Sequence, residues 1–139
     1  MRVMVIVKAN KDSEAGVLPS TELLRKMGKY NQELAEAGLL LSGDGLRPSS
    51  QGKRVKFPGK GHVITDGPFP ETKELIAGYW IWRVQSVDEA VAWLKRAPFD
   101  GGAEIEIRPL QEMEDCGPNL TPELRNQEQL LREQLGGKQ

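Results

Sequence analysis

The chain has 139 residues, with 19 basic and 20 acidic side chains, one histidine and one cysteine, which suits a single domain with a sizeable core. The balanced charge argues against direct nucleic-acid binding, because phosphate neutralisation requires a surplus of Lys and Arg. The lone Cys116 excludes an internal disulfide and lacks the companions of a zinc site. Every apolar run is too short for a membrane span, so we expect a cytoplasmic protein with no membrane partner, metal or cofactor.

Two elements are predicted in the first 40 residues. Residues 3–7 are apolar without alternation and largely β-branched, which is typical of a strand buried on both faces. Apolar residues then recur at helical spacing from Leu23 to Leu34. Ser20 or Thr21 can cap the start of this helix, and Gly38 suits its left-handed stop.

The middle of the chain is rich in turn signals and basic residues. Residues 39–48 include the sequence SGDG and predict a turn-rich connection, and two short strands near 55–57 and 62–65 form a hairpin joined by PGKG. Residues 47–60 carry five basic side chains and no acid. This stretch predicts either a solvated hairpin with lysine-protected edges or a site for phosphate or carboxylate.

Four further elements follow. Residues 77–85 predict a strand with Tyr79 and Arg83 on one face and tryptophans on the other. Residues 86–98 predict a helix that opens with a Ser-x-x-Glu capping box. Residues 103–110 alternate as a half-buried strand, and residues 121–135 predict a last helix with a thin leucine stripe.

This order predicts an α+β fold, a ferredoxin-like β-α-β-β-α-β sandwich with an extra C-terminal helix. We place the domain at residues 1–110 and the extension with its single helix at 111–139. Two helices cover one face of such a sheet, yet strands 3–7 and 77–85 are largely apolar on both faces. A large exposed apolar face marks an interface, so we expect a homodimer with the two sheets face to face.

The longest informative stretch is VITDGPFPETKELIAGYWIWRVQSVDEAVAWLKRAP, followed by AEIEIRPL. Together with MRVMVIVKA at the start and LAEAGLLLSGDGLRPS, it resembles the DGPF group of the YCII-related proteins over residues 1–110. The resemblance implies a dimeric α+β barrel and a small-molecule pocket near the dimer interface. It also implies a kinship with accessory proteins of extracytoplasmic-function sigma factors. Better-studied relatives have a His–Asp pair with the histidine on the first helix. The single histidine here is His62, so that pair is not carried over.

Asp66 of the DGPF signature is the main candidate site residue. It is either a general base or ligand-binding carboxylate, or the first residue of a well-made turn. An aspartate can bond to backbone groups two residues on, Gly67 permits unusual backbone angles, and Pro68 fixes its own φ. We favour the turn, which can also frame a pocket.

Four other residues are candidate ligand contacts. His62 lies four residues before Asp66 in one expected strand, about 13 Å away, which excludes a dyad within that strand. Lys73 can hold an anionic group or pair with an acid across the dimer. Tyr79 and Arg83 share a face, where Arg83 can receive a carboxylate from a ligand or from the partner chain.

These residues lead to two functional hypotheses. The first is a protein that binds a small polar or anionic organic molecule near the dimer interface, with metal-free acid–base chemistry by Asp66. The alternative is a regulatory interaction module that acts with a sigma factor or another transcription component through the helix at 121–135. The sequence does not decide whether the protein is an enzyme.

Overall fold

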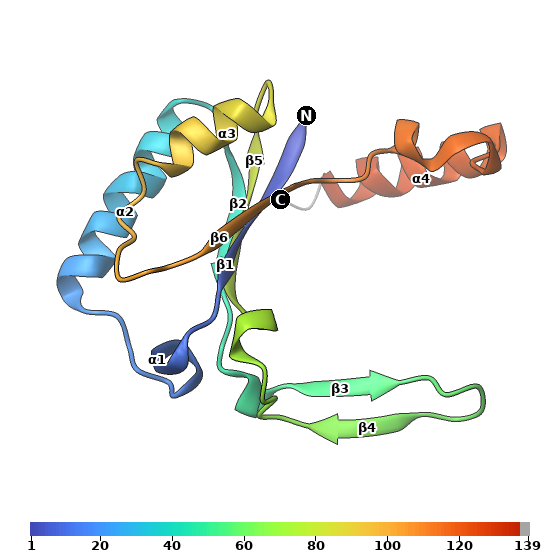
Figure 1. Ribbon diagram of the computed structural model, residues 1–139. Helices are drawn as coiled ribbons and strands as arrows, with labels where there is room; N and C mark the ends of the chain where they lie inside the picture. Colours follow the sequence, from blue (N-terminus) through green and yellow to red (C-terminus); the bar gives the residue numbers. More distant parts are fainter. Residues whose placement is uncertain (137–139) are drawn as a thin grey trace. The chain divides into compact units, whose positions relative to one another are not determined.

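The computed structural model describes residues 1–136, which form two compact units divided after Pro109. The first unit is built on a four-stranded antiparallel sheet in the order β2-β5-β1-β6. Its strands are β1 (Arg2–Lys8), β2 (Leu40–Gly45), β5 (Ile76–Arg83) and β6 (Ile105–Pro109). Helices α2 (Thr21–Glu36) and α3 (Val87–Leu94) lie on one face of the sheet (Figure 1). This is the expected ferredoxin-like topology, and the predicted fold class is confirmed.

The helices begin where the sequence offers caps. Ser20 accepts a hydrogen bond from Leu23 N at the start of α2, and Ser86 accepts one from Glu89 N at the start of α3. Gly38 adopts a φ of 79° just after α2, as the left-handed stop requires. A short helix that the sequence did not predict, α1 (Lys11–Glu14), is closed by a capping box between Asn10 and Ser13.

The second sheet strand is not where the sequence placed it. The segment expected to be a turn-rich connection contains edge strand β2, which pairs with β5. Gly43 fits this strand because a Cβ there would lie 2.5 Å from Cδ1 of Trp80. Glycine in a strand often marks such a close approach, so the turn-like composition of this segment was misread.

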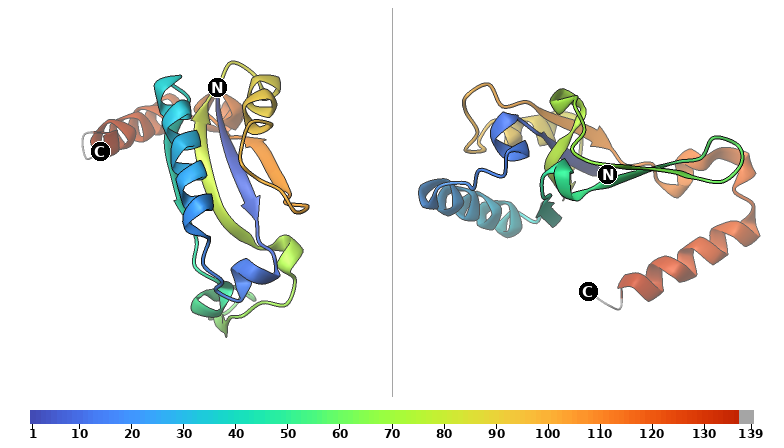
Figure 2. Two further views of the ribbon diagram at one scale, coloured as in Figure 1. Left: turned by 90° about the vertical axis from the view of Figure 1, so that its left-hand side faces the viewer. Right: turned by 90° about the horizontal axis from the view of Figure 1, so that it is seen from below.

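The predicted hairpin forms, but outside the main sheet. Strands β3 (Lys53–Lys56) and β4 (Val63–Asp66) pair with each other in a separate two-stranded sheet. Two views show this hairpin projecting from the first unit on the side opposite α2 and α3 (Figures 1 and 2). We call it the arm, residues 53–66.

The core lies between the sheet and its two helices. Val3, Val5, Trp80 and Trp82 point to this side, as the register of β1 against β5 requires, and pack with Tyr30 and other residues of the helices. The opposite face has Met4, Ile6, Tyr79 and Ile81 near its centre and charged residues around them. We call this second surface the open face, because neither α2 nor α3 covers it (Figure 1).

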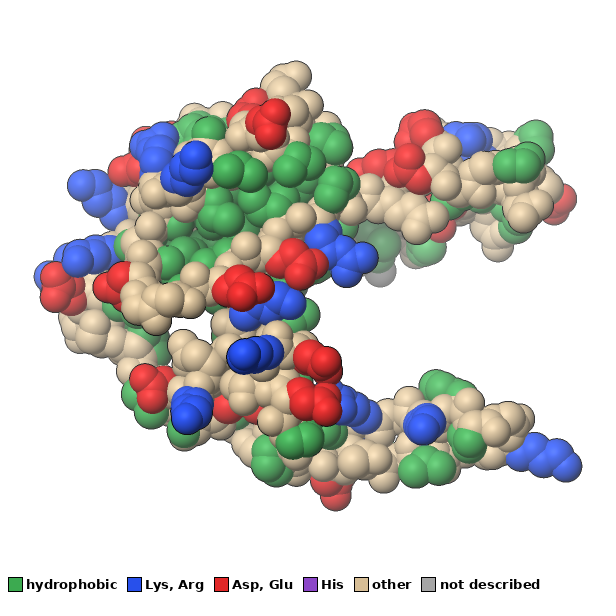
Figure 3. Space-filling model, viewed as in Figure 1, with side chains coloured by type: hydrophobic (Ala, Val, Ile, Leu, Met, Phe, Trp, Pro, Cys, Tyr) green, Lys and Arg blue, Asp and Glu red, His purple; other side chains and the backbone are tan. Residues whose placement is uncertain are grey.

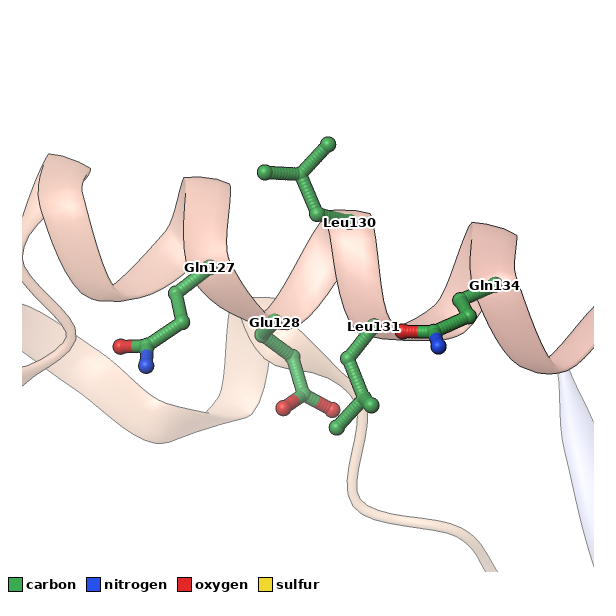
Figure 4. A pocket seen from close by; sticks show the side chains of 5 residues that line it. All are labelled: Gln127, Glu128, Leu130, Leu131 and Gln134. Carbon is green, nitrogen blue, oxygen red and sulfur yellow. The ribbon is translucent and has the colours of Figure 1, made fainter.

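The second unit comprises the described residues after Pro109. It contains a 3₁₀ segment (Met113–Asn119) and helix α4 (Pro122–Gly136), with Thr121 Oγ1 accepting from Leu124 N as the predicted cap. None of its described residues is buried, and the leucines of the predicted stripe, Leu124, Leu131 and Leu135, are about half exposed. A hollow along α4 is lined by Gln127, Glu128, Leu130, Leu131 and Gln134, all from this one helix (Figure 4).

Candidate functional site

The DGPF loop follows the arm and closes against a 3₁₀ turn, Ser49–Gln51, that lies between β2 and β3. Gly67 N donates to Gly52 O at 3.0 Å, and Phe69 N donates to Ser49 Oγ at 3.1 Å. The Gly67–Pro68 peptide bond is cis. The loop is therefore held by the segment before the arm, residues 49–52.

Gly67 has a different role from the expected one. Its φ is not among the positive values of the described glycines, so the turn needs no left-handed residue here. A Cβ on Gly67 would instead overlap the carbonyl oxygen of Ser49. Close approach of two backbones is what requires glycine at this position.

Ser49 connects this loop to the start of the chain. Its N donates to Glu14 Oε2 at 2.9 Å, and its hydroxyl donates to Glu14 Oε1 while it accepts from Phe69 N. These hydrogen bonds to the ionised form lower the pKa of Glu14, the side-chain bond being the largest cause. Glu14, Ser49 and Phe69 thus form one clamp across three segments.

A hollow of about 280 Å³ lies beside this clamp. Its wall combines acidic, basic and apolar groups: Glu14, Leu46, Arg47, Ser49, Arg54, Phe69, Glu74, Leu75 and Ile76. The guanidinium carbon of Arg54 lies 3.8 Å from the centroid of the Phe69 ring. This cation–π contact holds Arg54 against the wall. We call this hollow the DGPF pocket.

One carboxyl group of the pocket, that of Glu74, has a raised pKa. Glu74 ends a short 3₁₀ turn, Thr72–Glu74, that begins directly after Glu71. A hydrogen bond that protonated Glu74 donates to the Glu71 carboxylate raises the pKa of Glu74, and the negative charge of Glu71 raises it further, against the opposing charges of Arg54 and Lys8. Two neighbouring carboxyl groups that share one proton are typical of acid–base sites, although structural pairs behave in the same way.

The structure does not bring the five sequence-predicted residues together. The Asp66 side chain is 74% exposed and forms an ion pair with Lys53 across the arm. His62 is exposed, with its ring edge-on to Phe57 at 4.9 Å. Lys73 and Arg83 are exposed, and Tyr79 donates to Asp44 Oδ2 at 3.3 Å on the open face. The five positions do not line the DGPF pocket.

Some pocket residues that were not predicted lie in stretches that the sequence marks as charged, whereas others lie in stretches without any such signal. Arg47 and Arg54 belong to the basic stretch, and Glu74 belongs to the charged run after the signature. Glu14 and Ser49 gave no signal, because their contact joins residues 35 positions apart. The basic stretch was therefore the nearest sequence clue to this site.

Two kinds of feature are absent from residues 1–136. This part of the chain has no cluster of three or more His, Cys, Asp or Glu side chains able to hold a metal ion. It also has no helix with the length and apolar character needed to cross a membrane. The hollow on α4 has the walls of a single helix (Figure 4) and brings no set of catalytic groups together.

The protein thus has a ferredoxin-like α+β fold. A small pocket with charged and apolar walls lies beside the Gly67–Pro68 turn of the DGPF loop. The model of the YCII-related domain family matches residues 1–114. The chain belongs to this family.

Two individual proteins are also similar. An uncharacterised protein of Rhizobium meliloti (strain 1021) is 30% identical over 91 residues, which are 63% of this chain and 73% of that protein. A solved structure of a 5-chloro-2-hydroxyhydroquinone dehydrochlorinase from Burkholderia phenoliruptrix AC1100, in complex with 2,5-dihydroxybenzoquinone, covers 83% of this chain and 99% of its own. Its identity is 14% and its TM-score is 0.43, too distant to indicate a shared activity.

Proposed function

We propose that the protein binds a small anionic organic molecule in the DGPF pocket. The observation that carries this proposal is the presence of two arginines, Arg47 and Arg54, among the residues that line one hollow of about 280 Å³. Ligand pockets commonly span roughly 300–1,000 Å³, so the volume suits a molecule at the small end of that range. Leu46, Leu75 and Ile76 supply apolar wall for its carbon skeleton.

The two arginines are suited to a carboxylate or phosphate group. A guanidinium presents several N–H donors in a planar fork and bonds an oxyanion through two parallel hydrogen bonds. Arg54 is already ordered against Phe69, so it loses less side-chain freedom when the anion binds. Arg47 has a weaker contact, a 3.4 Å bond to Gln51, and is free to close over the ligand.

The acid–base role in this proposal goes to Glu74. The neighbouring Glu71 raises the pKa of Glu74, so Glu74 keeps its proton to a higher pH than an ordinary glutamate. When protonated, it can donate a hydrogen bond or a proton to a ligand beside the arginines. Asp66 is paired with Lys53 outside the pocket wall. If the protein is a catalyst, we expect metal-free proton transfer at Glu74.

A thermal-shift screen with small mono- and dicarboxylates, with inorganic phosphate as a simple anion, tests the proposal. We expect at least one carboxylate to raise Tm in a concentration-dependent manner. Arg54→Gln should abolish the shift. Lys56→Gln is the matched control, because it removes one positive charge from the same strand at a residue outside the pocket wall. Equal loss in both variants, or no shift with any carboxylate, would count against the pocket.

The second candidate function, a regulatory module, is supported by a different observation. Helix α4 presents Leu124, Leu131 and Leu135 half exposed on a stripe, and exposed leucine stripes are typical of helices that dock to a protein groove. We propose a transcription component such as a sigma factor as the partner. Size-exclusion chromatography of the purified pair, with Leu131→Ser as the disrupted form and Asn126→Ser as the control, tests this role.

A further inference from the structure

Glu14 places a fixed negative charge in the wall of the DGPF pocket. Both of its carboxylate oxygens are held by Ser49, one by the backbone N–H and the other by the hydroxyl. These donors are neutral, so they keep the side chain in place and leave its charge uncancelled. The same bonds lower the pKa of Glu14, which is therefore ionised at neutral pH. A molecule in this hollow shares it with a charged carboxylate.

The positive charge that the wall offers to a ligand comes from two side chains. Arg47 and Arg54 are the basic residues among those that line the hollow, and Glu14 and Glu74 are the acidic ones. Glu74 is either neutral or negative, depending on its proton. Two positive charges against one or two negative charges leave a net charge of +1 when Glu74 is protonated and of zero when it is ionised.

The charged groups next to the wall do not enlarge this surplus. Glu71 and Lys8 act on Glu74 from outside the wall with one negative and one positive charge. Lys8 is also paired with Glu106 at 3.3 Å. The space-filling view shows acidic and basic side chains interspersed between α1 and the base of the arm, without a continuous basic surface there (Figure 3). One ligand carboxylate is therefore the most that the pocket can neutralise.

The basic and acidic groups of the wall differ in how they can respond to a ligand. Arg47 donates a long 3.4 Å bond to Gln51 and can turn towards an anion. Glu14 cannot turn away as easily, because both of its bonds to Ser49 would break, and the Ser49 hydroxyl also holds Phe69 N. A second negative charge on a ligand in this small hollow would remain close to Glu14, and like charges repel at short range.

We propose that Glu14 is a specificity-determining residue, whose charge restricts the pocket to ligands with a single carboxylate and an apolar body. One carboxylate takes up the positive surplus of the wall, and the apolar body lies against Leu46, Leu75 and Ile76. A dicarboxylate of the same length leaves one negative charge without a cation in the presence of Glu14. The inference rests on the proposed ligand pocket and deepens it, because it names monocarboxylates as the class that is bound.

An NMR titration of the ¹⁵N-labelled full chain with hexanoate and with adipate tests this inference. The two acids have carbon chains of equal length and differ by one carboxylate. At neutral pH and low salt, we expect the wild type to bind hexanoate at least about fivefold more tightly than adipate. Glu14→Gln removes the charge and keeps the size of the side chain, so the preference should fall below about twofold.

Asp12→Asn is the matched control for the charge of Glu14. It removes one negative charge from the same short helix, α1, at a residue outside the pocket wall. We expect this variant to keep the preference for hexanoate. Equal loss of the preference in Glu14→Gln and Asp12→Asn would show that the effect does not come from the carboxylate in the wall.

The salt dependence of the wild type gives a second test, which covers the case in which Glu14→Gln loosens the loop. Salt screens the repulsion between Glu14 and a second carboxylate, so adipate should gain affinity relative to hexanoate as NaCl rises from about 20 mM to about 300 mM. A second carboxylate that is attracted by the arginines would instead make adipate lose affinity relative to hexanoate over this range.

The outcomes separate this inference from the proposed pocket. Adipate binding as tightly as hexanoate, a preference that survives Glu14→Gln, or a relative affinity of adipate that falls with salt would overturn the role of Glu14 while a carboxylate still binds. No binding of either acid would also overturn it. The absence of a thermal shift with every carboxylate would contradict the pocket itself.

Discussion

Gly67 shows how one residue fixes the signature corner. It lies so close to the carbonyl of Ser49 that any side chain would overlap the backbone, and its N–H completes the closure on Gly52. The corner is thus a packed junction of two backbone segments. Asp66 precedes this junction and points to Lys53 on the arm.

Gly67→Ala should lower the free energy of unfolding by about 1–3 kcal/mol, because the overlapped atom belongs to the backbone and cannot move aside cheaply. Differential scanning calorimetry gives the change as a fall in Tm of several degrees. Gly52→Ala is the control in the same corner, since its Cβ would meet Ser49 O at an ordinary 3.4 Å. Equal effects of the two substitutions would refute the close-approach explanation.

Tyr30 links α2 to the end of α3. Its hydroxyl donates to Trp93 O at 2.7 Å, and burial raises the pKa of Tyr30 to about 12. We expect Tyr30→Phe to cost about 1 kcal/mol of stability at neutral pH, measured by urea unfolding. A cost indistinguishable from zero would show that the hydroxyl contributes no net stabilisation.

The raised pKa of Tyr30 also predicts a dependence on alkaline pH. The folded state holds this proton more tightly than the unfolded state, so the contribution is complete below pH 10 and is lost as the pH rises towards 12. Wild-type stability should fall more steeply over this window than that of Tyr30→Phe. Parallel stability curves for the two proteins would contradict the assignment.

The pKa of Glu14 should lie below the ordinary value of 4.5, and the pKa of Glu74 should lie above it. The lowered pKa of Glu14 gives stability that is present above 4.5 and lost as pH falls through its folded pKa. The raised pKa of Glu74 gives stability that is present below 4.5 and lost as pH rises through its folded pKa. Carboxyl ¹³C titration by NMR should show this order, and Ser49→Ala should return Glu14 towards its ordinary value.

At the level of elements, the sequence predicted the features that depend on interactions between residues close together in the chain, such as helix caps. The caps at Ser20, Ser86 and Thr121 are where the sequence placed them, because a cap depends on residues within one helical turn. Strand β2 was missed because Gly43 makes room for the side chain of Trp80, which lies on another strand. The residues next to Gly43 in the sequence give no sign of this contact.

The pocket could be predicted only in fragments for the same reason. Basic and acidic stretches marked Arg54 and Glu74 as charged, but the sequence could not show that they share a hollow with Glu14. Asp66 and His62 were chosen from the signature itself. Their arm carries them away from the sheet, into an ion pair and a ring contact of its own.

The second unit is the element whose removal should matter least to the fold. Every residue of the buried core lies between Val3 and Ala90, and residues 110–136 contain no buried side chain. A chain ending at residue 117 should keep the far-ultraviolet circular dichroism of the sheet and a Tm within a few degrees of the full chain. A large loss of Tm would show that α4 supports the first unit.

At the scale of the whole protein, the two proposed functions use different units of the chain. Ligand binding is proposed in the DGPF pocket of the first unit, and binding of a protein partner is proposed on helix α4 of the second unit. Arg54 belongs both to the pocket wall and to β3 of the arm, so we expect a ligand in the pocket to influence the arm as well.

The most direct test of the central claim is an NMR titration of ¹⁵N-labelled full-length protein with the carboxylate that gives the largest thermal shift. The proposed pocket predicts saturable amide shifts concentrated at Ser49, Arg54, Phe69 and Glu74, absent in Arg54→Gln and retained in Lys56→Gln. Saturable shifts elsewhere, with these four amides unmoved, would show that the DGPF pocket is not the binding site.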